Sequence, residues 1–317
     1  MQMTSYGSAA QRGEKTLVFT TRKGRRGELA RKQRRAGIFL SAPALIHISI
    51  FIALPFFLNV FFGFTDYAFS PDWKFVWFQN YLELFKDDVF RTSLVNTLFY
   101  SAGAVPVAMA IALTVAVGLN RAMKGAKFLR SLYYVPTVTA SIAVGTIWLW
   151  IYQPNTGLAS HVLQFLGIHN STFMAGTSTA LPSVIVVAIW QGIGAKMIIY
   201  LAALQGVPVE LKEAANLDGA NAWQTFRNVV WPHLGPAHLF VLVTSVIASF
   251  QVFDLVYVMS NGSGGPVNST RVVALDVYKN AFDSLQFGYA CAESVILIFV
   301  MAILIFTGFR LQKRAES

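Results

Sequence analysis

The sequence predicts an all-α integral membrane protein, and its composition carries that prediction. Hydrophobic residues make up 55% of the chain and charged residues only 13%, whereas about a quarter of the residues in an average soluble domain are charged. Several apolar runs reach about 20 residues, the length that an α-helix needs to cross the hydrocarbon core of a bilayer. The single cysteine, Cys291, excludes an internal disulfide, so we expect helix packing to hold the fold together.

Six membrane spans are expected on the longest apolar runs. They lie at about 38–62, 94–119, 132–152, 181–204, 239–259 and 290–309. The first run is too long for the core of a cleaved signal peptide, and an arginine-rich arm precedes it. The fourth run contains Lys196 and the fifth contains Asp254. Charged groups inside a bilayer usually face a cavity or a partner, so we expect neither span to be surrounded by lipid alone.

Basic residues set the expected orientation. Ten lysines and arginines precede residue 36, four lie between residues 121 and 130, and three follow residue 309. The segment after the first span is instead rich in acids. Basic loops stay on the cytoplasmic side of the membrane. Both termini are therefore expected in the cytoplasm, together with the loop at 205–233.

The chain shows no sign of division into several folded domains. Residues 1–36 are polar, basic and without period. We expect them to form a disordered cytoplasmic arm that lies on anionic lipid, or that serves topology alone. No aromatic residues interleave with its charges, which argues against nucleic acid. Residues 37–310 are expected to form one six-helix transmembrane domain, and residues 311–317 a cytoplasmic tail.

The most specific pattern is PVELKEAANLDGANAWQTFRNVVWP at residues 208–232. This segment lies between two membrane-length runs but is too polar to cross a bilayer. It predicts two short helices, with acids in the first turns of the first helix, where the macrodipole favours them. Asp218 and Gly219 end that helix, and Asp218 is able to cap the next one. Ala214 and Ala215 leave one side almost without side chains, so another protein could approach the backbone closely.

The stretch EAANLDGANAWQTFRNVVWPHLGP resembles the EAA loop of binding-protein-dependent ABC importer permeases. In that family EAA is followed by two residues, DGA, an aromatic residue and a proline. The matching positions are Glu213, Ala214, Ala215, Asp218, Gly219, Ala220, Phe226 and Pro232.

Four further stretches are similar to the carbohydrate-uptake branch of this family, its maltose- and glycerol-phosphate-type first permease. They read NYLELFKDDVFRTSLVNTLFY, LNRAMKGAKFLRSLYYVPTVTASIAVGTIW, FQVFDLVYVMSNGSGGPVNST and AFDSLQFGYACAES. The resemblance extends over roughly residues 40–310. The turn NGSGGP departs from the family, which has a shorter turn before GGP.

The resemblance implies a type I ABC importer permease fold with a cytoplasmic EAA coupling helix, in a bacterial inner membrane. It implies a chain that is not an enzyme, because two copies of a separate ATPase would bind ATP and magnesium. This chain indeed has no G-x-x-x-x-G-K-[ST] loop. A second homologous permease and an external solute-binding protein would complete the importer. Its solute would be an oligosaccharide, sugar phosphate or polyol.

The resemblance also implies roles for residues of the loop. Glu213 would meet a basic residue of the ATPase, and Gly219 would give the sharp bend. The alternative for Glu213 and Asp218 is plain helix capping on a solvated loop.

Polar residues of the fourth and fifth runs are the candidates for the translocation path. By their place in the family's motifs, together with the charge at 196, the candidates are Gln191, Gly192, Lys196, Phe250, Gln251 and Asp254. Phe250, Gln251 and Asp254 are expected on one helical face by their spacing. Amides, a carboxylate and a ring suit a sugar, whose hydroxyls need donors and acceptors. Alternatively, Gln251 and Asp254 bond to neighbouring helices or to the second permease. Lys196 pairs with Asp254, contacts the solute or extends towards the interface.

Three other function classes remain as alternatives, and one of them, an ATP-independent scaffold, is excluded only by a test for partners. A secondary transporter would need an ion relay, for which Lys196 and Asp254 are the main groups available, and the EAA loop would then have no purpose. A membrane enzyme would need clustered acids, histidines or a nucleophile, and none cluster in the sequence. No histidine or cysteine group has the spacing of metal ligands, so no metal site is expected.

Overall fold

The computed structural model of the chain describes residues 23–120, 124–167 and 172–315. Nearly all regular structure in these residues is helical. Their one pairing of extended backbone is an isolated bridge between Thr65 and Phe75. The all-α prediction is therefore confirmed. The contacts divide the chain into two compact units, with the boundary between Phe56 and Phe57.

The first unit contains α1 (Lys23–Ile48), the π-helix η1 (Ser49–Ala53) and the beginning of α2 (Leu54–Phe62). We expected no regular structure before residue 37, yet residues 23–36 are helical. The reason is local, because lysine, arginine, alanine, glutamate and glutamine dominate this stretch and all are good helix formers. Residues 1–22 of the predicted arm lie outside the described residues.

Four helical stretches of the described chain are long and apolar enough to cross a membrane, or up to six if each of two bent pairs is one span. The four are Gly37–Phe62, α4 (Asp88–Leu119), α8 (Ala180–Gln205) and Phe287–Arg310 within α15 (Phe287–Ala315). They correspond to the first, second, fourth and sixth predicted spans. The two bent pairs fall on the third and fifth.

The third predicted span is not one straight helix. α5 (Ala126–Val138) and α6 (Ser141–Ile151) meet at 99°. Thr139 and Ala140 between them have extended backbone, with ψ angles of 136° and 130°. The carbonyl of Thr139 has a partner outside its own helix, the side chain of Gln191. A tertiary contact thus stabilises a break that the apolar run does not reveal.

The fifth predicted span is wrong in extent. α12 (Gly235–Phe250) stops at Phe250, and a separate helix, α13 (Asp254–Met259), follows. The spacing predicts that Phe250, Gln251 and Asp254 share one helical face. This prediction is wrong, because the helix ends at Phe250 and a new helix begins at Asp254. Packing decides this: Phe250 is buried in a core cluster, whereas the ring of Phe253 lies 5.1 Å from that of Tyr278.

The other half of this bent pair precedes α12. Residues Ala222–His233 form α10 (Ala222–Thr225), the π-helix η3 (Phe226–Val230) and α11 (Trp231–His233), and they meet α12 at 64°. The remaining short helices are α3 (Gln79–Leu84), α7 (Leu158–Phe165), η2 (Phe173–Ala175), α9 (Val209–Leu217), η4 (Pro266–Asn268), α14 (Val273–Tyr278) and η5 (Lys279–Asp283).

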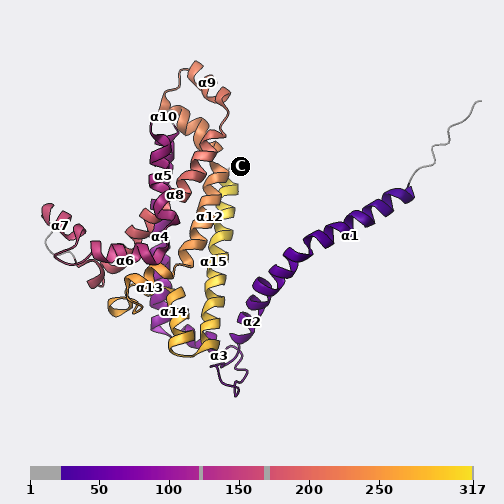
Figure 1. The fold of residues 1–317 in the computed structure, drawn as a ribbon, viewed down its shortest axis with the longest axis vertical. Coiled ribbons are helices and arrows are strands. Elements are labelled where there is room, and N and C mark those ends of the chain that lie inside the picture. The colour runs from indigo at the N-terminus through magenta and orange to yellow at the C-terminus, as the bar shows by residue number, and fades with distance from the viewer. Residues whose placement is uncertain (1–22, 121–123, 168–171, 316–317) are drawn as a thin grey trace, which may run out of the picture. The chain divides into compact units, whose positions relative to one another are not determined.

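In the second unit α4, α8, α12 and α15 run side by side (Figure 1). α9 and the C-terminal end of α15 lie at one end of this unit, and α3 and α14 lie near the other. A stripe of small residues lets α4 and α8 approach closely, as in other membrane helix pairs. The stripe consists of four buried alanines spaced four apart, Ala104, Ala108, Ala112 and Ala116.

Candidate functional site

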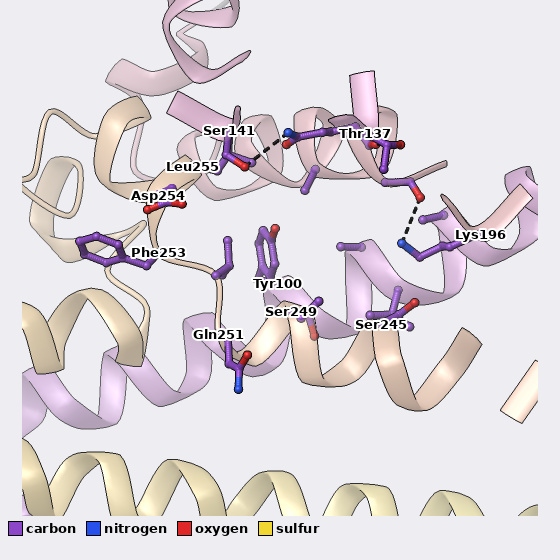
Figure 2. Close-up of a pocket in the computed structure, with 18 residues that line it drawn as sticks. Tyr100, Thr137, Ser141, Lys196, Ser245, Ser249, Gln251, Phe253, Asp254 and Leu255 are labelled. Carbon is purple, nitrogen blue, oxygen red and sulfur yellow. Dashed lines mark hydrogen bonds between the residues drawn. The ribbon is translucent and has the colours of Figure 1, made fainter. Parts of the chain in front are cut away.

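A cavity of about 360 Å³ opens between α4, α5, α6, α8, α12 and α13 (Figure 2). All the predicted path residues except Phe250 line it. These are Gln191, Gly192, Lys196, Gln251 and Asp254. Further polar or aromatic lining residues are Tyr100, Thr137, Ser141, Ser245, Ser249 and Phe253. The fold therefore gathers side chains from several helices and one connecting segment around one space.

The cavity lies near the middle of the long helices that line it. Gln191 and Lys196 belong to the central turns of α8, and Tyr100 and Ala108 to the central part of α4. In a helix that crosses a bilayer, the central turns lie near the midplane. Polar groups at that depth are costly unless they face water, a ligand or each other.

Gln191 holds the break of the third span in place. Its Nε2 donates to the carbonyl of Thr139 at 3.1 Å and to the hydroxyl of Ser141 at 3.3 Å. The hydroxyl of Thr137 in turn donates to the backbone carbonyl of Gln191 at 2.7 Å. Gln191 thus fixes one wall of the cavity through the backbone carbonyl of Thr139 and the side chains of Ser141 and Thr137.

Lys196 and Asp254 lie at opposite ends of the cavity (Figure 2). Lys196 Nζ donates to the carbonyl of Gly192 at 3.2 Å. A Cβ at position 192 would lie 2.9 Å from this Nζ. The absence of a side chain at Gly192 therefore leaves room for the ammonium. Among the described residues no ion pair joins Lys196 to Asp254. The pairing that the sequence left open is therefore not made here.

Phe250 was expected in the path but is only 1% exposed and packs in a core cluster with Leu84 and Phe90. Phe253 lines the cavity in its place. The residues missed from sequence include Ser245 and Ser249. Their spacing of four puts both on one face of the predicted span, which was a usable signal. Ser249 also donates to Ser101 of α4 at 2.7 Å, both side chains being buried.

The EAA loop forms a second candidate site, at the end of the second unit where α9 lies (Figure 1). α9 ends as a glycine predicts: Gly219 has φ +79°, and the amide of Ala220 donates to the carbonyl of Ala215 at 2.9 Å. This is the hydrogen bond of a Schellman motif, in which a left-handed glycine reverses the chain.

The next helix is capped by Asn221, not by Asp218. Asn221 accepts from the amide of Gln224 at 2.9 Å, and the Gln224 side chain accepts from the amide of Asn221 at 2.8 Å. This capping box satisfies two helix-end donors at once. Asp218 is the C-cap residue that follows α9, directly before the glycine, and it is exposed. A capping asparagine three residues later leaves it nothing to cap.

The rest of α9 presents an open surface. Glu213 and Ala214 are exposed, Ala215 and Ala220 are partly exposed, and Leu217 is 89% exposed. Val209, Leu211 and Trp223 of the same loop are also exposed, by 60%, 46% and 67%, and several exposed apolar side chains on one short segment fit an interaction surface. A helical membrane protein with a polar cavity at mid-span and an uncovered helical loop at one end has the arrangement of a transport permease.

Comparison with known proteins defines the family. Residues 104–317 match the family described as "Binding-protein-dependent transport system inner membrane component". The diacetylchitobiose uptake system permease protein NgcF of Streptomyces coelicolor is 36% identical over 295 residues, which cover 88% of this chain and 83% of that protein. The multiple sugar-binding transport system permease protein MsmF of Streptococcus mutans is 33% identical over 281 residues, 88% and 95% of the two chains. The chain therefore belongs to this family of ABC importer permeases, as the resemblance predicted.

A solved structure agrees with the fold. A bacterial ABC transporter involved in the import of the acidic polysaccharide alginate contains a chain that superimposes with a TM-score of 0.75. The match covers 92% of this chain and 100% of the other at 22% sequence identity. The predicted type I importer permease fold is therefore confirmed.

Proposed function

We propose that this chain forms the translocation path for a sugar or sugar-like solute in an ATP-driven importer. The cavity at mid-span carries this proposal. It offers an amide, hydroxyls, a carboxylate and an ammonium as polar partners, and Tyr100 and Phe253 as rings. Sugar hydroxyls need donors and acceptors, and polar groups that converge on one pocket fix the orientation of a ligand and give specificity.

The names of relatives support the solute class. They include permeases for diacetylchitobiose and for multiple sugars. The sn-glycerol-3-phosphate transport system permease protein UgpA of Yersinia pestis is 30% identical over 242 residues, 76% of this chain and 81% of that protein. An oligosaccharide, a sugar phosphate or a polyol is accordingly the proposed cargo.

The chain would use ATP only through a partner. Two copies of a separate ATPase would bind ATP and magnesium, and α9 would dock on them. Glu213 would face a basic residue of the ATPase, the small Ala214, Ala215 and Ala220 would allow close approach, and Gly219 would hold the bend. Closure of the ATPases would then move the attached helices as rigid bodies, so that the cavity opens to alternate sides.

The complete importer would also contain a second homologous permease and an external solute-binding protein. A related alginate transporter was solved in complex with a periplasmic protein that carries an alginate pentasaccharide, which supports the last partner. The basic segments support a cytoplasmic position for both termini and α9, in a bacterial inner membrane.

Exchange of one loop residue tests the proposal. The importer, with its second permease and ATPase, is reconstituted in proteoliposomes with the binding protein. ATP-driven uptake is measured with labelled diacetylchitobiose, starch oligosaccharides and sn-glycerol 3-phosphate. We expect Glu213→Lys to abolish uptake, while solute still binds the external protein.

Glu210→Lys is the matched control, since Glu210 is exposed on the same short helix but lies outside the EAA pattern. It should keep most of the uptake. Unchanged uptake with Glu213→Lys would refute the coupling role. Uptake by the unaltered chain that needs no ATP and follows an ion gradient would favour a secondary transporter instead.

A further inference from the structure

A row of five rings runs from the EAA loop into the helices of the cavity. Trp223 and Phe226 stack with their centroids 5.9 Å apart, and Phe226 meets Trp231 edge-on at 6.2 Å. Trp231 lies 4.5 Å from the ring of His238, and His238 lies 5.2 Å from the ring of Tyr200. We call these five residues the ring row. Such ring pairs are attractive beyond the apolar area that they bury.

The ring row joins elements that are otherwise separated by bends. It begins in α10, passes through η3 and α11, crosses the 64° bend to His238 in α12 and ends at Tyr200 in α8. One turn of α8 separates Tyr200 from Lys196, and two turns of α12 separate His238 from Ser245. Lys196 and Ser245 both line the cavity. The row therefore ends on both helices that could transmit a movement of the loop to the solute.

The last contact of the row is also a hydrogen bond. Nδ1 of His238 lies 3.1 Å from the hydroxyl of Tyr200. Tyr200 is only 1% exposed, and Nε2 of His238 is buried without a hydrogen-bond partner among the described residues. A hydrogen bond shielded from water is stronger than an exposed one. It is a polar link between α8 and α12 next to the loop.

The segment that the ring row spans is suited to movement. η3 is a π-helix, a form that occurs mostly as short insertions at functional positions. Without cross-contacts, a wide helical turn next to a bend would absorb a displacement of the loop. Coupling between distant sites is carried by packed side chains and hydrogen bonds that connect rigid elements. The ring row supplies such contacts on both sides of the bend.

We propose that Tyr200 and His238 are positioning residues that latch α8 and α12 to the EAA loop, so that the loop and both cavity helices move as one body. This inference rests on the proposed importer function. When the ATPase displaces the loop, the latch passes the displacement to α8 and α12. Without this contact, η3 deforms and absorbs the displacement of the loop. The ATPase then hydrolyses ATP while the helices that line the cavity do not move.

Tyr200→Phe tests the latch, because it removes one hydroxyl and keeps the ring. Solute transported per ATP hydrolysed is measured in proteoliposomes for the complete importer. Loss of one shielded hydrogen bond should lower this ratio about fivefold, with ATP hydrolysis largely retained. Tyr152→Phe is the matched control. Tyr152 is also buried and also donates to α8, at 3.2 Å from the carbonyl of Ser183, but it stands outside the ring row.

His238→Phe, alone and combined with Tyr200→Phe, completes a double-mutant cycle. If the pair acts as one latch, the double variant loses no more than either single variant. His238→Phe also decides the question should Tyr200→Phe fail to assemble. A ratio unchanged by these variants, or lowered equally by Tyr152→Phe, would overturn the latch. If the unaltered importer shows no ATP-driven uptake, the proposed function itself fails, which is a different result.

Discussion

Lys196 and Asp254 give the cavity one charge of each sign at its two ends (Figure 2). Charges at mid-membrane depth are costly unless they face water, a ligand or a partner, and neither of these two forms an ion pair within the described residues. Lys196 has its ammonium tied back to the carbonyl of Gly192, whereas Asp254 has an exposed carboxylate. Of the two, Asp254 is the group most available to a solute.

Asp254→Asn should therefore impair solute handling and leave the fold intact. A hydrogen bond from a sugar hydroxyl to a carboxylate is stronger than one to an amide, so we expect KM for uptake to rise about tenfold. The midpoint of thermal unfolding should hardly change, because the side chain is exposed. The measurement is the concentration dependence of uptake in proteoliposomes, beside a thermal unfolding curve in detergent.

Asp283→Asn serves as the control for removal of a carboxylate. Asp283 is exposed on η5, outside the cavity, and pairs with Lys279 at 3.3 Å. Its exchange should leave KM unchanged. An equal rise of KM in both variants, or no rise with Asp254→Asn, would remove Asp254 from the path.

At the scale of elements, the close crossing of α5 and α8 shapes the cavity. Gly194 in α8 lies against the backbone of α5, since a Cβ at this position would be 2.8 Å from Cα of Tyr134 and 2.7 Å from Oγ1 of Thr137. Thr137 also bonds to the carbonyl of Gln191. The crossing and the break after α5 therefore depend on each other.

Gly194→Ala should push the two helices apart. The added methyl group meets backbone that cannot rotate away, so we expect a loss of about 1–3 kcal/mol of stability and a lower Tm in detergent. Gly118→Ala is the matched control, because a methyl group added at Gly118 in α4 would have open space around it, with no neighbouring atom within 4 Å. Alanine is the better helix former there, so Tm should stay or rise. Equal shifts in the two variants would contradict a close α5–α8 contact.

At the scale of the whole molecule, the spans of the second unit are only partly buried by the chain itself. Within the described residues of this unit, 33%, 44% and 33% of the most apolar windows of α4, α8 and the span in α15 are buried. Exposed apolar surface on a membrane helix is covered by lipid or by another protein. The amount left open fits a subunit of a larger complex.

Co-expression with the second permease that we propose should therefore stabilise this chain. A partner that binds only the folded state raises Tm in proportion to its affinity and concentration. Thermal unfolding in detergent, with and without the second permease, measures the effect. Mass spectrometry of the complex from gently solubilised membranes should detect this chain, the second permease and the ATPase. The proposed function implies one copy of each permease for two copies of the ATPase. If this chain is equally stable with and without the second permease, and no ATPase co-purifies with it, the results would point to a transporter that works without these partners.

Composition and local motifs sufficed for much of this description. Long apolar runs require membrane helices whatever their neighbours are, so the class of protein and the place of most spans followed from the sequence. The EAA pattern identified the family, and the path candidates of the fourth run, Gln191, Gly192 and Lys196, all line the cavity. The end of α9 at Gly219 was also predictable, because the left-handed turn is closed by backbone hydrogen bonds within the loop itself and requires no tertiary contact.

Tertiary structure decided where the helices break and what lines the cavity. An apolar run has no local signal for the bend at Thr139, which depends on an amide donated from Gln191, 52 residues away. Likewise, only the packing around Phe250 and Phe253 decided which ring is buried and which faces the cavity. Propensity and periodicity describe a helix by itself, whereas the end of a helix inside a membrane depends on which other group satisfies its backbone.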